Sequence, residues 1–168
     1  MVKEMKRMTE QQLVLFDLAS EHYAIDSMNV REIIRMQAIT KIPGAPASVE
    51  GVINLRGKVT PVMDLRKRLG LEVGQESKET RIVVVEVGGQ DVGLVVDGVS
   101  EVLRIPVSVI EPTSTIVAPE EADYILGVAK LETKLVILLD IGRLLAGDER
   151  RMPVGAPVSR DGAAAGAV

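Results

Sequence analysis

Two stretches of the 168-residue chain repeat each other, and this repeat constrains the fold more than any other feature. Between residues 51–69 and 127–145, six positions carry the same residue at a constant offset of 76. Average composition would give about one identity in a window of this length. The repeat therefore predicts two similar structural units. In the first copy, its identical positions are Gly51, Val52, Leu55, Lys58, Asp64 and Leu69.

Each copy of the repeat has the pattern of a β-hairpin followed by a helical turn. In the first copy, strands over 51–55 and 58–63 flank Arg56-Gly57, and Asp64 is placed to cap a short helix. The second copy has the equivalent pattern over 127–145. Short closed barrels are a common arrangement of such hairpins, because closure removes exposed sheet edges. We therefore predict two small, pseudo-equivalent β-barrels.

The remainder of the chain is also rich in short strands. Leu13–Phe16 is an apolar run, and residues 81–87 and 92–96 flank Gly88-Gly89, a pair that accepts the positive φ angles of a tight turn. Residues 27–36 fit two patterns, because their apolar positions have both helical and alternating spacing. Helix and strand both stay open for that segment.

The two ends differ in composition from the middle. Residues 1–12 are charged and polar and are expected to be flexible, and residues 147–168, rich in Ala, Gly and Pro, are expected to form a disordered tail. Residues 13–146 would be the folded domain. The N-terminus lacks the apolar core of a secretory signal, and the longest apolar stretches are far shorter than a membrane span. We therefore expect a cytoplasmic protein that is not inserted in a membrane.

Composition excludes several classes of function. The net charge of −4 and the three aromatic residues disfavour nucleic-acid binding, which needs a basic face or stacking side chains. The absence of cysteine and the single histidine, His22, predict no metal site. Neither a phosphate-binding loop nor a dinucleotide fingerprint is present, so no cofactor is predicted.

Carboxylates offer the one route to catalysis. Asp64, Asp97 and Asp140 each follow an apolar strand, where two of them could form an acid–base pair. However, Asp64 and Asp140 are placed as helix caps, and Asp97-Gly98 has the composition of a turn. An enzyme is therefore disfavoured, and a small carboxylate hydrolase is the less favoured alternative.

A binding protein agrees better with the residues. Glu32 and Arg56 are the charged residues that we would pair near a binding surface, because the planar guanidinium of Arg matches a carboxylate. Two unrelated, solvated charges would explain the sequence equally well. The hairpin tip also differs between the repeats, with residues 54–57 in one and 130–133 in the other, although the surrounding scaffold is shared.

These segments together resemble the CheW family of bacterial chemotaxis coupling proteins. Each piece is weak alone, but their order and spacing are specific and cover roughly residues 13–145. The pieces are Tyr23-Ala24-Ile25-Asp26, Val30-Arg31-Glu32-Ile33, Ile42-Pro43-x-x-Pro46, the run from Gly51 to Arg66, the run from Val92 to Val99, and Asp140-Ile141.

The resemblance implies an all-β fold with a few short helices, built as two intertwined five-stranded SH3-like barrels. It implies a non-catalytic adaptor in membrane-associated receptor arrays. The implied partners are the regulatory domain of the chemotaxis histidine kinase CheA and the cytoplasmic tip of methyl-accepting chemotaxis receptors. A scaffold for a non-motility chemosensory pathway is the alternative within the same family.

The resemblance also implies two groups of contact residues. Receptor contact is expected from an apolar face around Val30 and Leu55, with Arg56 providing polar specificity. Kinase contact is expected from the segment that follows. The receptor-binding positions are Val30, Glu32, Asn54, Leu55, Arg56 and Gly57, and the kinase-binding positions are Ile39, Thr40 and Ile42.

Overall fold

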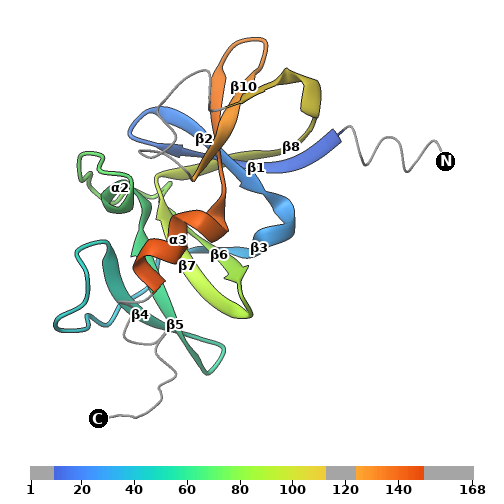
Figure 1. Cartoon of the computed structure of the whole chain (residues 1–168). Coiled ribbons are helices and arrows are strands. Elements are labelled where there is room, and N and C mark those ends of the chain that lie inside the picture. The colour runs from blue at the N-terminus through green and yellow to red at the C-terminus, as the bar shows by residue number, and fades with distance from the viewer. Residues whose placement is uncertain (1–9, 113–123, 150–168) are drawn as a thin grey trace.

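The strands form two sheets, which lie in the upper and lower halves of the computed structural model (Figure 1). The structure describes residues 10–112 and 124–149. In spatial order, the six-stranded sheet contains β8 (Gly98–Pro106), β1 (Glu10–Leu18), β2 (Glu21–Asp26), β11 (Leu135–Leu139), β10 (Ile125–Lys130) and β9 (Ile110–Pro112). The five-stranded sheet contains β3 (Val30–Arg35), β6 (Arg81–Val87), β7 (Gln90–Val96), β5 (Lys58–Asp64) and β4 (Val49–Leu55).

The helices in the described part of the chain are short. They are the 3-10 turns η1 (Ser27–Asn29) and η2 (Val107–Val109) and the α-helices α2 (Leu65–Arg68) and α3 (Ile141–Glu149). Asp64 caps α2 by accepting a hydrogen bond from the Arg66 N–H at 2.9 Å, as the sequence predicted. None of the described helices is long and apolar enough to cross a membrane.

The two halves of the chain exchange hairpins. Hairpin β1–β2, from the first half, pairs with β8 and β11 of the second half. Hairpin β6–β7, from the second half, pairs with β3 and β5 of the first half. The prediction of an all-β protein with two intertwined barrel units is therefore confirmed. We call the six-stranded unit the first barrel and the five-stranded unit, which carries the first copy of the repeat, the second barrel. The first barrel has a sixth strand, the three-residue β9, beyond the five expected.

A backbone crossing closes each barrel in the same way. In the second barrel, Thr40 and Val52 exchange two backbone hydrogen bonds, both 2.9 Å long. In the first barrel, Glu111 of β9 occupies the equivalent place opposite Val128. Since Val52 and Val128 are matching positions of the repeat, the Thr40 bridge is the second barrel's counterpart of β9.

This crossing explains why glycine recurs in the repeat. A Cβ atom on Gly51 would overlap the carbonyl oxygen of Thr40, and one on Gly127 would overlap the carbonyl oxygen of Glu111. Each glycine also lies where the hairpin register shifts by one residue. Glycine is needed at both places because two backbones approach too closely for a side chain.

Three apolar cores stabilise this arrangement. One fills the first barrel, a smaller one fills the second, and the largest lies between the barrels, with residues from both sheets. Strands β1 and β6 line the central core with one face and a barrel core with the other. All side chains of Leu13–Phe16 and Ile82–Val85 are therefore buried, which explains their continuous apolar runs.

The structure decides between helix and strand for residues 27–36, and its first strand and last helix extend beyond the expected domain, 13–146. Residues 27–29 form η1, and Val30–Arg35 form a strand, so the alternating pattern prevails. Strand β1 begins at Glu10 rather than Leu13, because pairing with β8 orders its polar start. Helix α3 continues to Glu149, inside the expected tail. The rest of the expected flexible end (1–9) and tail (150–168) lies outside the described residues.

We predict that Gly127→Ala lowers the free energy of unfolding by roughly 3 kcal/mol, because the new methyl group forces the crossing strands apart. Gly98→Ala is the control, since its Cβ would lie 3.6 Å from the nearest atom, an ordinary contact. The control should stay within about 0.5 kcal/mol of the wild type. Urea unfolding followed by circular dichroism measures both. Equal stability of the two variants would contradict this account of the repeat.

Candidate partner-binding site

Glu32 and Arg56 form a two-pronged ion pair. Arg56 Nη2 donates to Glu32 Oε1 at 2.6 Å, and Nη1 makes a second, shorter bond to Oε2. Glu32 lies on β3, and Arg56 lies at the tip of the β4–β5 hairpin. The sequence left pairing and separate charges equally open, and the structure shows the pair. A fork-to-carboxylate contact of this kind fixes the guanidinium plane as well as its position.

The hairpin tip is a two-residue turn that holds Arg56 in a strained conformation. Arg56 and Gly57 both have positive φ angles, +54° and +81°, and the Asn54 side chain accepts a hydrogen bond from the Gly57 N–H at 2.7 Å. Such turns favour Asn or Gly at both positions. Placing Arg in the left-handed region costs roughly 1 kcal/mol. The backbone does not favour arginine here, so its side chain is the reason for its presence.

The ion pair also joins the two edges of the second barrel. Strands β3 and β4 are the outermost strands of the five-stranded sheet, and the pair crosses the gap between them. The Arg56 side chain is 72% exposed, whereas Glu32 is 24% exposed. The carboxylate therefore holds the guanidinium from below, and the outer face of the guanidinium stays open to a partner.

The two apolar residues of the expected receptor face, Val30 and Leu55, pack against different cores. Val30 is half-buried and packs against the core between the barrels. Leu55 is also half-buried, but it packs against the core inside the second barrel. The two side chains therefore pack against different cores, and the shared receptor face around them stays a prediction.

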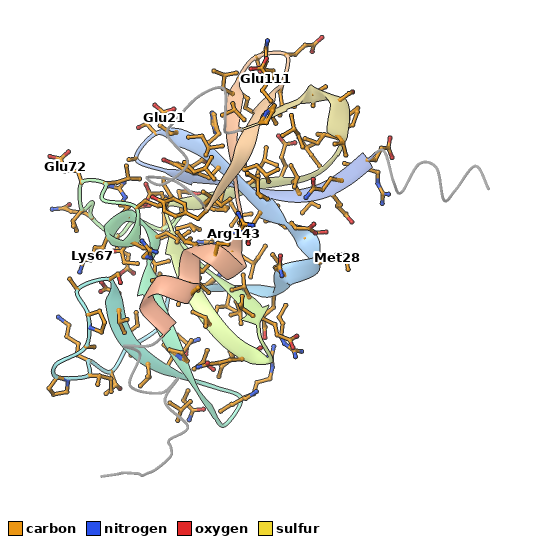
Figure 2. All side chains as sticks on the ribbon, viewed as in Figure 1. Glu21, Met28, Lys67, Glu72, Glu111 and Arg143 are labelled. Carbon is orange, nitrogen blue, oxygen red and sulfur yellow. The ribbon has the colours of Figure 1, made fainter. Side chains whose placement is uncertain are left out.

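An exposed methionine, which sequence reasoning missed, lies beside Val30. Met28 projects from η1 at the corner between the two sheets and is 91% exposed (Figure 2). The Asp26 carboxylate fixes this corner by accepting a hydrogen bond from the Met28 N–H at 2.8 Å. The Asp26-to-Met28 spacing was a signal for such a cap, and it would have placed Met28 on a turn.

The candidate kinase-binding residues lie on the segment that closes the second barrel. Ile39 is half-buried and packs against the core of that barrel. The backbone of Thr40 is committed to the bridge with Val52, but its side chain is exposed. Ile42 is half-buried, and its carbonyl oxygen accepts a hydrogen bond from Ala45 N–H. Of Ile39, Thr40 and Ile42, only Thr40 is exposed rather than half-buried.

The carboxylates considered for catalysis have structural partners. Burial raises the pKa of Asp64 despite the hydrogen bond from the Arg66 N–H. Asp97 pairs with the Arg66 side chain, and Asp140 accepts a hydrogen bond from the Arg143 N–H at 3.2 Å. Within the described residues, no group of three or more His, Cys, Asp or Glu side chains could hold a metal ion.

The pKa values of Glu32 and Arg56 both shift in the direction that favours the charged form. Hydrogen bonds from the guanidinium lower the pKa of Glu32 below its ordinary value. The same bonds raise the pKa of Arg56. Both groups are therefore ionised at neutral pH.

Comparisons with known proteins agree on one family. The family model described as a CheW-like domain matches residues 12–149. The chain is 34% identical to the chemotaxis protein CheW of Klebsiella aerogenes over 139 residues, which are 83% of this chain and 84% of the relative. It is 35% identical to CheW of Bacillus subtilis, over 82% of this chain and 88% of the relative. The crystal structure of the scaffolding protein TtCheW from Thermoanaerobacter tengcongensis matches with a TM-score of 0.77 and 40% identity, over 85% of this chain and 97% of that protein.

We predict that Arg56→Ala raises the pKa of Glu32 toward its ordinary value, which NMR titration of the side-chain carboxyl measures. Because the pKa is lowered in the folded protein, the pair stabilises the fold above the ordinary pKa of Glu, about 4.3. This contribution is lost as the pH falls through the lowered pKa. Lys58→Ala, in the same hairpin, should leave the titration of Glu32 unchanged. An unchanged pKa in Arg56→Ala would show that the pair does not form in solution.

Proposed function

The chain belongs to the CheW-like family of chemotaxis scaffolds, and on that premise we propose that it joins two partners without catalysing a reaction. One partner is the cytoplasmic tip of a methyl-accepting chemotaxis receptor. The other is the regulatory domain of the histidine kinase CheA. The adaptor would work in the cytoplasm, in receptor arrays at the membrane, with no cofactor. The relatives from Klebsiella aerogenes and Bacillus subtilis are named chemotaxis proteins, which favours chemotaxis over a non-motility pathway.

One observation carries the receptor half of the proposal. Arg56 is held in a left-handed turn that favours other residues. The carboxylate of Glu32, which is less exposed than Arg56, orients the guanidinium toward solvent. Strained backbone conformations cluster where a side chain must be presented to a ligand. Val30, Asn54, Leu55 and Gly57 support this site from below, since they shape the turn or pack beneath the strands. Met28 extends the proposed surface with an exposed apolar side chain.

The kinase half of the proposal uses the segment with Ile39, Thr40 and Ile42. This segment closes the second barrel through the Thr40–Val52 bridge, so its backbone is fixed before a partner arrives. A preorganised segment binds with less loss of conformational entropy than a free loop. Thr40 is the residue of the three that offers an exposed side chain on this fixed backbone.

We predict that Arg56→Ala weakens binding of a receptor-tip fragment at least about tenfold, since truncating a central Arg anchor costs roughly 2 kcal/mol or more. Isothermal titration calorimetry measures this. Lys58→Ala is the matched control, because Lys58 is an exposed cation of the same hairpin, and its affinity should stay near that of the wild type. Binding of the kinase regulatory domain should not change in either variant. Wild-type affinity of Arg56→Ala for the receptor tip would remove Arg56 from the site.

Exchanging the two charges distinguishes a direct contact between Arg56 and the receptor from a purely structural role of the ion pair. The double variant Glu32→Arg with Arg56→Glu restores an ion pair across the barrel gap but reverses the charge shown to a partner. If Arg56 contacts the receptor, the double variant should be stable and still bind the receptor tip weakly. Recovery of wild-type affinity would instead assign Arg56 a purely structural role.

We predict that Thr40→Ala weakens binding of the kinase regulatory domain by roughly 1 kcal/mol while leaving receptor binding intact. The backbone bridge to Val52 does not involve the Thr40 side chain, so the barrel should stay closed. Calorimetry with both partners tests this, and unfolding by urea checks the barrel. Unchanged kinase affinity in the folded variant would move the kinase contact away from Thr40.

A further inference from the structure

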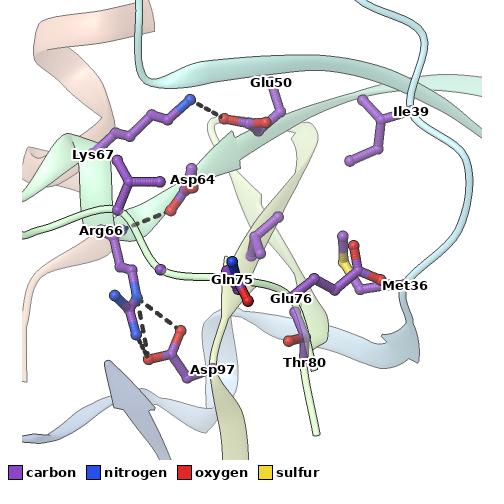
Figure 3. A pocket seen from close by; sticks show the side chains of 13 residues that line it. Met36, Ile39, Glu50, Asp64, Arg66, Lys67, Gln75, Glu76, Thr80 and Asp97 are labelled. Atoms are coloured by element: carbon purple, nitrogen blue, oxygen red, sulfur yellow. Dashed lines mark hydrogen bonds and ion pairs between the residues drawn. The ribbon is translucent and has the colours of Figure 1, made fainter. Parts of the chain in front are cut away.

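Arg66, a half-buried cation on helix α2, connects three parts of the fold. Its Nε lies 2.9 Å and 3.1 Å from the two carboxylate oxygens of Asp97, and Nη2 makes a shorter bond to the same carboxylate. Its Nη1 donates to the carbonyl oxygen of Glu72 at 2.8 Å. The side chain is 19% exposed. Figure 3 shows the guanidinium meeting Asp97 at one side of a pocket.

Asp97 extends this connection from the second barrel to the first. It is the residue between β7 and β8, where the chain passes from one sheet to the other. Its N–H donates to the Asp17 carbonyl oxygen at 3.0 Å, and its carboxylate accepts from the Ala19 N–H at 2.8 Å. Burial would raise the pKa of Asp97, but Arg66 and the Ala19 N–H outweigh burial and lower it. The carboxylate is therefore charged at neutral pH.

The turn that Asp97 holds is strained. Ala19 and Ser20 join β1 to β2 with φ angles of +51° and +72°, whereas the equivalent β6–β7 turn uses Gly88 and Gly89. Each non-glycine residue in the left-handed region costs roughly 1 kcal/mol. The hydrogen bond from Ala19 to Asp97 offsets part of this cost. The Ala19–Ser20 turn therefore depends on the hydrogen bond to Asp97, whereas the Gly88–Gly89 turn needs no such contact.

On its other side, Arg66 holds segment 71–79, which we call the strap and in which only Leu71 packs against the central core. The Leu71 N–H donates to the Arg66 carbonyl oxygen at 2.7 Å, and the Arg66 side chain binds the Glu72 carbonyl oxygen. The guanidinium lies so close to Gly74 that a Cβ atom there would overlap it. Residues 72–79 are exposed, so apolar burial contributes little to their position.

The strap faces the segment that closes the second barrel. Val73, Gly74, Gln75 and Glu76 line a cavity of about 180 Å³ together with Met36 and Ile39. Figure 3 shows Gln75, Glu76, Met36 and Ile39 around this cavity. Arg66 and Asp97 line the same cavity. The contact that holds the strap is thus also one of the contacts between the two barrels.

We propose that Arg66 and Asp97 are positioning residues for the kinase-binding segment. Together they fix the strap, which lines the same cavity as Met36 and Ile39, and they add a polar contact between the two barrels. Loss of their ion pair releases the strap and the Ala19–Ser20 turn at the same time. The cavity wall next to the kinase-binding segment is then no longer fixed, although the Thr40–Val52 bridge stays closed. This inference rests on the proposed kinase contact of that segment.

Three substitutions test the proposal in different ways. Asp97→Asn keeps an oxygen for the Ala19 N–H but removes the charge that binds Arg66. Arg66→Lys keeps the positive charge but removes the fork that reaches both Asp97 and Glu72. Gly74→Ala changes no charge and displaces the guanidinium by steric overlap alone. Gly98→Ala, next to Asp97, is the control because its Cβ would make only ordinary contacts.

Hydrogen exchange measured by mass spectrometry on the full chain is the first readout. The three variants should exchange about tenfold faster in residues 71–79, and Asp97→Asn and Arg66→Lys also near Ala19. Core amides of β6 should keep their wild-type protection, which excludes general destabilisation. Wild-type exchange in the strap of all three variants would overturn the proposal.

Calorimetry with the two partner fragments is the second readout. The affinity for the kinase regulatory domain should fall roughly fivefold, a typical size for coupling between sites, while receptor-tip affinity stays unchanged. Release of the strap with unchanged kinase affinity would overturn the positioning role. If the wild-type protein bound neither fragment, the proposed function would fail, but hydrogen exchange would still decide whether Arg66 and Asp97 hold the strap.

Discussion

Burial of β1 and β6 on both faces is the constraint on which the rest of the structure depends. Each strand supplies one face to a barrel core and the other to the central core, so neither barrel can form its complete core alone. The exchange of hairpins between the two halves follows from this, because each central strand must be paired from both sides. The β4–β5 hairpin, whose tip carries Arg56, lies at the edge of this shared scaffold.

The parts of this fold that follow local rules could be predicted from the sequence. The Gly88-Gly89 turn and the cap at Asp64 depend on neighbours in the chain, and both were confirmed. The repeated glycines were visible as a repeat, but their cause, the crossing with Thr40 and Glu111, was not. The Glu32–Arg56 pair was suggested by residue chemistry, with two separate charges left equally open, because no local pattern fixes a contact between residues 24 positions apart. The separate cores of Val30 and Leu55 were missed, since the side-chain directions depend on a bulge in β3 and on barrel closure. The contact between Arg66 and Asp97 spans residues far apart in sequence and has no local signal.

The two barrels solve the same problem of closure with different chemistry. In the second barrel, Arg56 of the β4–β5 tip binds Glu32 of the edge strand β3. In the first, Lys134 at the end of the β10–β11 turn binds Glu101 of the edge strand β8 at 3.2 Å. Both tips thus place a cation over a glutamate of an edge strand. Lysine is sufficient to bind such a glutamate, so the ion pair alone does not explain a forked guanidinium at Arg56.

The distribution of backbone strain supports the same conclusion. Among the described residues, the non-glycine positions with positive φ are Ala19, Ser20 and Arg56. Glycine would remove the strain at each position, as Gly88 and Gly89 show in the equivalent turn of the other barrel. In both strained turns, a polar link to a distant part of the chain accompanies the strain: Asp97 holds Ala19, and Glu32 holds Arg56. Strain that is offset by a long-range contact makes the turn depend on that contact. A partner that binds Arg56 therefore acts on the contact between Arg56 and Glu32, which joins the two edge strands of the second barrel.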